Sequence, residues 1–423
     1  MTIVSAEPTK DFFISMLTRD ISLLSALVDL IDNSVDAALL TGGFVGKNIE
    51  IEINKDYFSI KDNCGGISKL AAENYAFKFG RPASAPDTPH SVGRFGVGMK
   101  RALFKLGKVF HIESRHEEHS FNINVNVDEW IGSADDWNFQ LEEIEVQSDD
   151  YGTKIKVSNL HGSISEKFDD RVFVNSLISM VGKAHHKVLA NGLRVKINGE
   201  EVQTKDILIK NSDDLGFYSE SFEINGVLIV IKAGVGERNL HQGGWYVYCN
   251  DRMIEEASTT AMTGWGVDGI RSYHTDFAFF RGVIEFNSAD GAKLPWNTTK
   301  TGIDTDNPIY RTALVKMKVA MRKILLLLSE RIKEQNAVDL GSIEESMINK
   351  AIVEAPLTSI FGLKLAESFI RPTFNQPPKQ ITERRISYSV KDSELMIVKD
   401  SLGLNTNKDV GLYTFRHYLE NEC

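Results

Sequence analysis

The stretch "ALVDLIDNSVDAAL", residues 26–39, combines apolar residues with four polar side chains at helical spacing. In a helix, residues three or four positions apart are neighbours, so Asp29, Asp32, Asn33 and Asp36 share one side. Most of the other positions are Leu, Ile, Val or Ala, which favour burial against a core. Taken alone, this polar side is more typical of a solvated helix surface than of a ligand site, and both interpretations stay open at this point.

Length and composition indicate an ordinary soluble globular protein of two or three domains. The chain has 423 residues, of which 42% are hydrophobic and 25% charged. The three cysteines, Cys64, Cys249 and Cys423, are too scattered to indicate a disulfide framework or a zinc site. A net charge of −10 argues against a uniformly basic surface, although it leaves a local basic groove open.

No segment of the sequence predicts membrane insertion. The longest apolar run, "ILLLLS" at 324–329, is far shorter than a bilayer-spanning helix requires. The N-terminal residues also lack the basic-then-apolar order of a signal peptide. We therefore expect a cytoplasmic protein with no membrane contact.

The first 162 residues predict an α+β layer in which helices pack on one face of a mixed sheet. Period-two alternation predicts strands, and apolar spacing of three and four predicts helices. The expected helices are 21–40, 69–80 and 99–107, and the expected strands are 48–53, 57–60, 108–115, 120–127, 139–146 and 153–160. The last four are expected to form successive antiparallel strands, and 81–98 is expected to be a loop.

A second α+β region is expected at 163–335. It begins with a helix at 171–189, continues through several strands and closes with a long helix at 307–335. Residues 336–385 predict a helical segment that ends in a linker, "PTFNQPPKQITERR" at 372–385. Residues 386–423 predict a small element of two short helices.

Three further motifs carry chemistry, although each is weak alone. In "DNCGGI", 62–67, Asp62 ends a strand and can accept a hydrogen bond from an exocyclic amine, while Gly66 lets a ring approach the backbone. In "GRFGVGMK", 93–100, three glycines precede a helix and offer backbone N–H groups to phosphates. In "GTKI", 152–155, Thr153 begins a strand and can hydrogen-bond a base.

In this order and spacing, the four motifs resemble the nucleotide-binding boxes of the GHKL ATPases. This superfamily includes DNA gyrase B, the heat-shock chaperone ATPases, the histidine kinases and mismatch-repair MutL. The Microrchidia-type branch is similar through "LIDNSVDA" and "GVGMK". The resemblance covers about the first 160 residues, and it implies a Bergerat-type ATP-binding α/β sandwich followed by a transducer-type domain.

The resemblance also implies roles for individual residues. Asn33 would hold Mg²⁺, Asp62 would bind the adenine amino group of ATP, and the glycines from 93 to 98 would form a lid over the phosphates. The polar side of the 26–39 helix would then look inward. The residues implied for nucleotide binding are Asn33, Asp36, Asp62, Gly66, Ile67, Gly93, Gly96, Val97, Gly98, Lys100 and Thr153.

The sequence departs from the family pattern at two positions. Hydrolysing members usually have glutamate four residues before the magnesium asparagine, where this chain has Asp29 as the implied water-activating residue. Aspartate is one methylene shorter, and a misplacement of about 1 Å can cost about a hundredfold in rate, so we expect slow turnover. Cys64 stands where the family more often has glycine, and Gly65 is expected to take over the turn.

The loop "LPWNTTKTGID", 294–304, resembles the transducer loop in which a lysine reaches the γ-phosphate, and Lys300 matches that lysine. The alternative is an ordinary lysine in a surface turn. The second region and the absence of any histidine before His90 argue against a histidine kinase.

Three other patterns are predicted to be less specific. "KAHHK", 183–187, predicts a solvated helix face, because adjacent residues do not converge on one metal ion. The aromatic residues of "GWYVYCNDR" at 244–252 predict core packing. The linker around 371–391 is basic, which is a modest indication of a nucleic-acid or protein contact.

We therefore expect a Mg²⁺- and ATP-dependent homodimer that works as a conformational clamp. By analogy with the Microrchidia and gyrase branches its target would be DNA, and a chaperone-like protein client is the competing target. The C-terminal element is a further candidate for a protein contact. The alternative function is a nucleotide-sensing regulatory or scaffold subunit with little hydrolysis, which Asp29 keeps open.

Overall fold

The computed structural model describes residues 8–80, 82, 89–92, 96–133, 136–145, 150–297, 299–375 and 385–422. The chain forms two compact units, Met1–Gln376 and Pro377–Cys423. The division between them falls inside the segment that the sequence predicts to be a linker.

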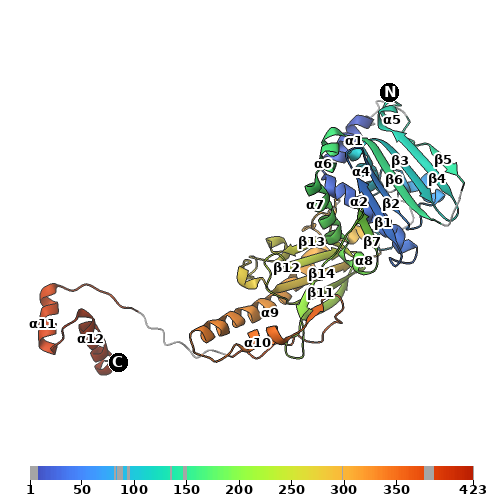
Figure 1. The fold of residues 1–423 in the computed structure, drawn as a ribbon. Helices are drawn as coiled ribbons and strands as arrows, with labels where there is room; N and C mark the ends of the chain where they lie inside the picture. The colour runs from blue at the N-terminus through green and yellow to red at the C-terminus, as the bar shows by residue number, and fades with distance from the viewer. Residues whose placement is uncertain are drawn as a thin grey trace, which may run out of the picture. The chain divides into compact units, whose positions relative to one another are not determined.

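The first unit begins with an eight-stranded mixed sheet in the order β5-β4-β3-β6-β2-β1-β7-β8 (Figure 1). Its pairs are antiparallel except for β1 and β7, which run parallel. The strands are β1 (Asn48–Ile53), β2 (Tyr57–Asp62), β3 (Gly107–Arg115), β4 (Ser120–Asn126), β5 (Leu141–Ile144), β6 (Gly152–Leu160), β7 (Arg194–Ile197) and β8 (Glu200–Glu201).

Helices cover one face of this sheet (Figure 1). They are α1 (Lys10–Arg19), α2 (Leu23–Leu40), α3 (Lys69–Ala71), α4 (Gly98–Leu106), α5 (Val127–Gly132), α6 (Gly162–Phe168), α7 (Arg171–Ala184) and α8 (His186–Ala190). Ser22 caps α2 by accepting a hydrogen bond from the Ser25 N–H, and twelve side chains of α2 are buried. The α+β class and the one-sided helix layer predicted from the sequence are confirmed.

The strand order differs from a run of successive antiparallel neighbours. β6 lies between β3 and β2, so after β5 at the edge the chain returns past β4 and β3 to the centre of the sheet. β7 and β8, which lie beyond residue 162, pair into the same sheet, and the first core continues to Val202. The structure therefore carries this layer past the boundary expected at 162.

The helix expected at 69–80 is shorter than predicted. α3 ends at Ala71 and passes into one π-helical turn, η1 (Ala72–Ala76). The residues after η1 have no regular structure, and the ring centroid of Phe79 lies 4.8 Å from that of Phe13.

The second half of this unit contains a five-stranded sheet in the order β10-β11-β14-β12-β13. β12 and β14 run parallel, and the other pairs are antiparallel. The strands are β10 (Tyr218–Ile224), β11 (Val227–Val235), β12 (Gly244–Cys249), β13 (Arg252–Ser258) and β14 (Phe280–Asn287). A separate two-stranded sheet joins β9 (Leu208–Lys210) to β15 (Leu357–Ser359).

The long helix α9 (Pro308–Asp339) packs on one face of the five-stranded sheet, and α10 (Met347–Glu354) packs against α9. A smaller core lies on the other face, where Tyr246 and Tyr248 of β12 contact Ile360. The aromatic residues of β12 are thus core residues, as predicted. Short 3-10 turns occupy η2 (Ala261–Thr263), η3 (Thr275–Phe277) and η4 (Gly291–Lys293).

The second unit contains α11 (Asp392–Leu402) and α12 (Asn407–Asn421). Its described residues leave most apolar side chains exposed, including Ile397, Phe415 and Tyr418. Val410 is a buried residue of α12. Across the described residues, no helix is both long and apolar enough to span a membrane.

Candidate nucleotide-binding site

The polar side of α2 divides into two buried carboxylates and one exposed amide. The side chains of Asp29 and Asp32 are buried, whereas Asn33 is exposed. The amide of Asn33 has no hydrogen-bond partner among the described residues, so its oxygen is available to an external ligand. An amide oxygen is a ligand type that Mg²⁺ accepts.

Asp29 lies between the glycine segment and the second half of the unit. Arg101 Nη2 donates to Asp29 Oδ2 at 2.6 Å, and Lys300 Nζ lies 3.6 Å from Oδ1. A Cβ atom at Gly98 would lie 3.3 Å from the same Oδ2. The start of α4 therefore packs directly on the carboxylate implied to activate water.

Asp62 ends β2 as a buried carboxylate with three protein donors. Ser34 Oγ donates to Oδ2 at 2.7 Å, and the N–H groups of Cys64 and Thr153 donate to Oδ1 at 2.9 and 3.2 Å. Burial raises the pKa of Asp62, and the hydrogen bond from Ser34 opposes that rise most strongly. Each carboxylate oxygen has two lone pairs, so Oδ2 retains acceptor capacity for an exocyclic amine.

The double glycine after Asp62 is required by the fold of the protein itself. Gly65 and Gly66 have φ of 113° and 74°, a region that favours glycine. A Cβ atom at Gly66 would lie 2.2 Å from the Arg115 carbonyl oxygen. Gly66 is thus needed because this turn packs closely against β3. The sequence had instead suggested that glycine is needed here so that a ligand ring can approach the backbone. Ile67 follows, and its N–H donates to Ser114 Oγ at 2.6 Å.

The glycine segment leads directly into α4. Gly96 has a φ of 65°, Val97 is the N-cap, and Gly98 is the first helical residue. Gly93 lies outside the described residues. At the other end of this segment, Asp36 accepts hydrogen bonds from Ser91 Oγ at 2.6 Å and from the Val92 N–H at 2.7 Å. Asp36 therefore contacts the base of the loop.

Lys100 is buried in the first turns of α4. Its Nζ donates to the Ala76 carbonyl oxygen at 2.8 Å, and it forms no ion pair with any residue in the described ranges. Burial lowers the pKa of Lys100 to about 7. A buried ammonium group without a carboxylate partner is a favourable environment for an anionic ligand.

Lys300 is buried and reaches α2 from the loop after β14. Its Nζ donates to Asp32 Oδ2 at 2.7 Å. The backbone of Lys300 is left-handed, with a φ of 52°, and its N–H donates to the Asn297 carbonyl oxygen. Lysine rarely adopts this conformation, and such residues concentrate at functional sites. The alternative of an ordinary surface lysine is therefore wrong.

Asp32 is the centre of a buried ionic cluster that joins the two halves of the unit. His185 Nε2 and Arg252 Nε lie 2.8 and 3.0 Å from Oδ1, while Lys300 contacts Oδ2. Burial alone would raise the pKa of Asp32, but Arg252, Lys300 and His185 hold that pKa well below its ordinary value. Burial lowers the pKa of His185, so its ring is neutral near pH 7.

Four residues of this site were not anticipated from the sequence: Ser34, Arg101, His185 and Arg252. The prediction of a solvated face for "KAHHK" is wrong, because His185 and His186 are both buried. α7 ends at Ala184 and α8 begins at His186, and His185 between them contacts Asp32. The apolar residues on both sides of "KAHHK" were the available signal that the segment is covered.

Asn33 is the residue of this site that fits a magnesium ion. No group of three His, Cys, Asp or Glu side chains is placed to hold a metal among the residues that the structure describes. A magnesium ion here would therefore need most of its oxygen ligands from a bound phosphate and water, which is its usual coordination in nucleotide sites.

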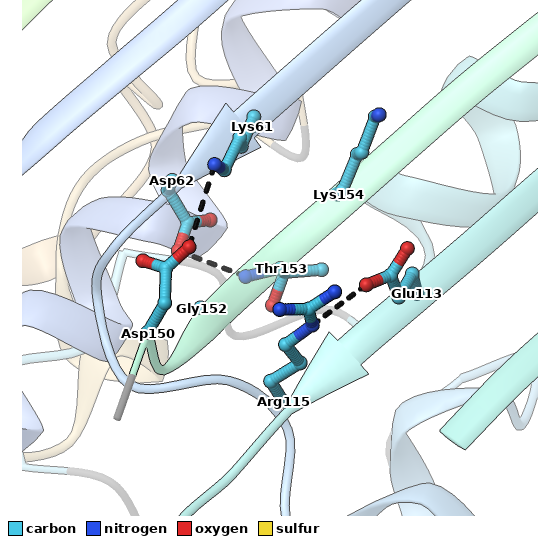
Figure 2. A pocket seen from close by; sticks show the side chains of 8 residues that line it. All are labelled: Lys61, Asp62, Glu113, Arg115, Asp150, Gly152, Thr153 and Lys154. Atoms are coloured by element: carbon cyan, nitrogen blue, oxygen red, sulfur yellow. Dashed lines mark hydrogen bonds and ion pairs between the residues drawn. The ribbon is translucent and has the colours of Figure 1, made fainter. Parts of the chain in front are cut away.

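A shallow hollow lies near the ends of β2, β3 and β6 (Figure 2). Lys61, Glu113 and Lys154 line it, with an ion pair of 3.5 Å from Lys61 to Asp150. These three side chains alternate with buried residues of their strands, so they lie on the sheet face opposite α2. Asp62 and Thr153 of the candidate site also line the hollow, which therefore adjoins the end of β2 where Asp62 lies.

Comparisons with known proteins agree with this geometry. A family model described as "Histidine kinase-, DNA gyrase B-, and HSP90-like ATPase" matches residues 21–156. This range begins just before α2 and contains Asn33, Asp62, the glycine segment and Thr153. A comparison with curated proteins found no match. Residues 21–156 form a domain of the histidine kinase-, DNA gyrase B- and HSP90-like ATPase superfamily.

Proposed function

We propose that this protein binds Mg²⁺-ATP, hydrolyses it slowly and uses the bound nucleotide to drive domain closure. The observation that carries the proposal is the contact of Lys300 with Asp32, at 2.7 Å, beside the exposed amide of Asn33. A lysine from the second half of the unit thereby reaches the helix implied to hold the metal. One ligand at this point can bias both halves together.

The residues of the first sheet supply the binding interactions. Asp62, oriented by Ser34 and Thr153, accepts a hydrogen bond from the adenine amino group. Asn33 contributes an amide oxygen to magnesium, and the bound ion neutralises part of the phosphate charge. Lys100 and the N-terminal end of α4 offer positive charge and backbone donors to the phosphates.

Slow hydrolysis follows from the surroundings of Asp29. Its Oδ2 is occupied by Arg101 at 2.6 Å, whereas Oδ1 faces Lys300 at the longer distance of 3.6 Å. A water molecule can be activated at Oδ1 once Lys300 moves away, because Arg101 holds Oδ2 and orients the carboxylate. The aspartate is still one methylene shorter than the usual glutamate, which limits the rate.

The second candidate function is a nucleotide sensor with little turnover, and the Arg101–Asp29 ion pair favours it. A guanidinium that stayed on Asp29 would occupy Oδ2 in every state and leave one carboxylate oxygen for a water molecule. A steady-state assay of phosphate release separates the two functions, because a sensor would give no release above that of the Asp29→Asn variant.

Closure tests the proposed function directly. ATP carries a terminal phosphate that ADP lacks, and a fixed ammonium group in a dry site can distinguish the two by a few kcal/mol. This difference is large enough to shift a two-state equilibrium from mostly open to mostly closed. By analogy with the superfamily, the closed form is proposed to be a homodimer.

The experiment is small-angle X-ray scattering with light scattering on wild-type protein, with a non-hydrolysable ATP analogue or with ADP. The analogue should give a compact closed dimer, and ADP should not. Lys300→Ala should bind the analogue but remain open, whereas Lys293→Ala, an exposed lysine near the same loop, should close like wild type. Complete closure of Lys300→Ala would remove the transducer role.

For the target of the clamp we propose duplex DNA, on the basis of the superfamily resemblance and the exposed basic residues Arg385 and Lys391. The exposed apolar residues of α11 and α12 support a separate protein contact through the second unit. A protein client in place of DNA is the alternative outcome.

A further inference from the structure

Asp32 and Lys300 form a buried ion pair between the two halves of the unit. The carboxylate is fully buried, and its two oxygens have different partners. Oδ1 takes the ring of His185 and the guanidinium of Arg252, and Oδ2 takes the Lys300 ammonium at 2.7 Å. The three partners come from three separate segments of the chain.

The cluster carries more positive than negative charge. Among the described residues, Asp29 and Asp32 face three cations, Arg101, Arg252 and Lys300, while His185 is neutral. An uncompensated positive charge in a buried site is unfavourable, and an added anion relieves it. The position beside Asn33 is where a nucleotide phosphate would supply that anion.

The three cations differ in how freely they can move. Arg101 is joined to Asp29 by a 2.6 Å hydrogen bond, and Arg252 lies at the start of β13 with a second bond to the Met253 carbonyl oxygen. Lys300 has a flexible side chain on a turn and reaches toward both carboxylates. Departure of Lys300 leaves Asp32 compensated, since Arg252 and His185 remain on Oδ1.

We infer that Asp32 is a positioning residue that competes with the terminal phosphate of ATP for Lys300. In the resting state Lys300 lies on Asp32, and in the ATP state it moves to the phosphate while Arg252 and His185 hold the vacated carboxylate. Asp32 thereby raises the ATP concentration at which closure occurs. This inference rests on the proposed function and adds its regulation.

Competition between Asp32 and the terminal phosphate for Lys300 predicts an effect that a purely structural role of Asp32 would not produce. Asp32→Asn removes the competing charge, so Lys300 should favour ATP over ADP more strongly than in wild type. We expect the ratio of the ADP and ATP-analogue dissociation constants to rise at least about fivefold. A residue that only supported the fold would weaken the binding of both nucleotides or leave their ratio unchanged.

The experiment is calorimetry with ADP and with a non-hydrolysable ATP analogue on four proteins: wild type, Asp32→Asn, Asp32→Asn with Lys300→Met, and Lys187→Met. The double variant should lose the increase in the ratio. Lys187→Met removes a half-buried lysine that pairs with Asp251 and Glu285 and makes no contact with Asp32, so it should keep the wild-type ratio. An unchanged or lower ratio in Asp32→Asn overturns the inference.

A measurement on wild-type protein covers the case in which Asp32→Asn does not fold. The side-chain ¹⁵N signal of Lys300, identified by its loss in Lys300→Arg, should shift with the ATP analogue and not with ADP. Equal behaviour with both nucleotides overturns the inference and leaves nucleotide binding intact. No binding of either nucleotide to wild type would instead overturn the proposed function.

Discussion

Ser34→Ala tests how the structure holds Asp62, the carboxylate proposed to bind adenine. The hydroxyl of Ser34 donates to Asp62 Oδ2 at 2.7 Å in a buried position. A hydrogen bond to a charged group is worth about 1.5–3 kcal/mol, and about 1.4 kcal/mol corresponds to a tenfold change in affinity. We expect the affinities for ATP and ADP to fall together by about tenfold, because both nucleotides share the adenine.

The same substitution should change the pH dependence of binding. Burial raises the pKa of Asp62 and Ser34 opposes this rise, so Ser34→Ala raises the pKa further. Asp62 becomes protonated as pH falls through its folded pKa. As pH is lowered, nucleotide affinity should therefore begin to decline at a higher pH in the variant than in wild type.

Calorimetry at several pH values measures both effects. Ser25→Ala is the matched control, because Ser25 is also buried on α2 but its hydroxyl lies 2.8 Å from that of Ser22. A folded Ser34→Ala protein that binds both nucleotides like wild type would refute the assignment of Asp62 to adenine.

Three other predictions address hydrolysis, charge burial and the target. Asp29→Asn should reduce phosphate release at least about tenfold, because it keeps the size and loses the base; equal turnover would assign the base elsewhere. Between about pH 7 and 9, Lys100 keeps its proton in the unfolded chain but loses it in the folded protein. The free energy of unfolding should therefore rise by up to about 1.4 kcal/mol per pH unit. Denaturant titrations should show a smaller rise for Lys100→Met. Parallel slopes in the two proteins would contradict the lowered pKa of buried Lys100. Duplex DNA binding should weaken steeply with salt, and no binding at low salt, with or without ATP, would favour a protein client.

Local patterns in the sequence predicted the elements of the fold well. The apolar spacing of α2 and the alternation of β1 follow from short stretches of chain, and both elements appear near the predicted bounds. The position of β6 between β3 and β2, and the parallel pairing of β7 with β1, depend on contacts between distant residues. No local pattern determines which distant strands will pair.

The candidate site divides in the same way. Asn33, Asp62 and the glycine segment were predicted from motifs of a few residues. Arg252 and His185 were missed because they meet Asp32 across 220 and 153 residues of chain. Sequence spacing also suggested that the polar side of α2 acts as one surface, whereas Asp32 binds protein cations and Asn33 remains exposed.

Titration of wild-type protein and Asn33→Ala with ATP, with and without Mg²⁺, tests the central claim most directly. Asn33 is proposed as the direct protein ligand of the metal, so wild type should bind Mg²⁺-ATP and the variant should lose the magnesium-dependent part of the affinity. Asn191→Ala, at an exposed asparagine after α8, should bind like wild type. No calorimetric binding by wild type, or equal magnesium-dependent affinity in Asn33→Ala, would contradict the account.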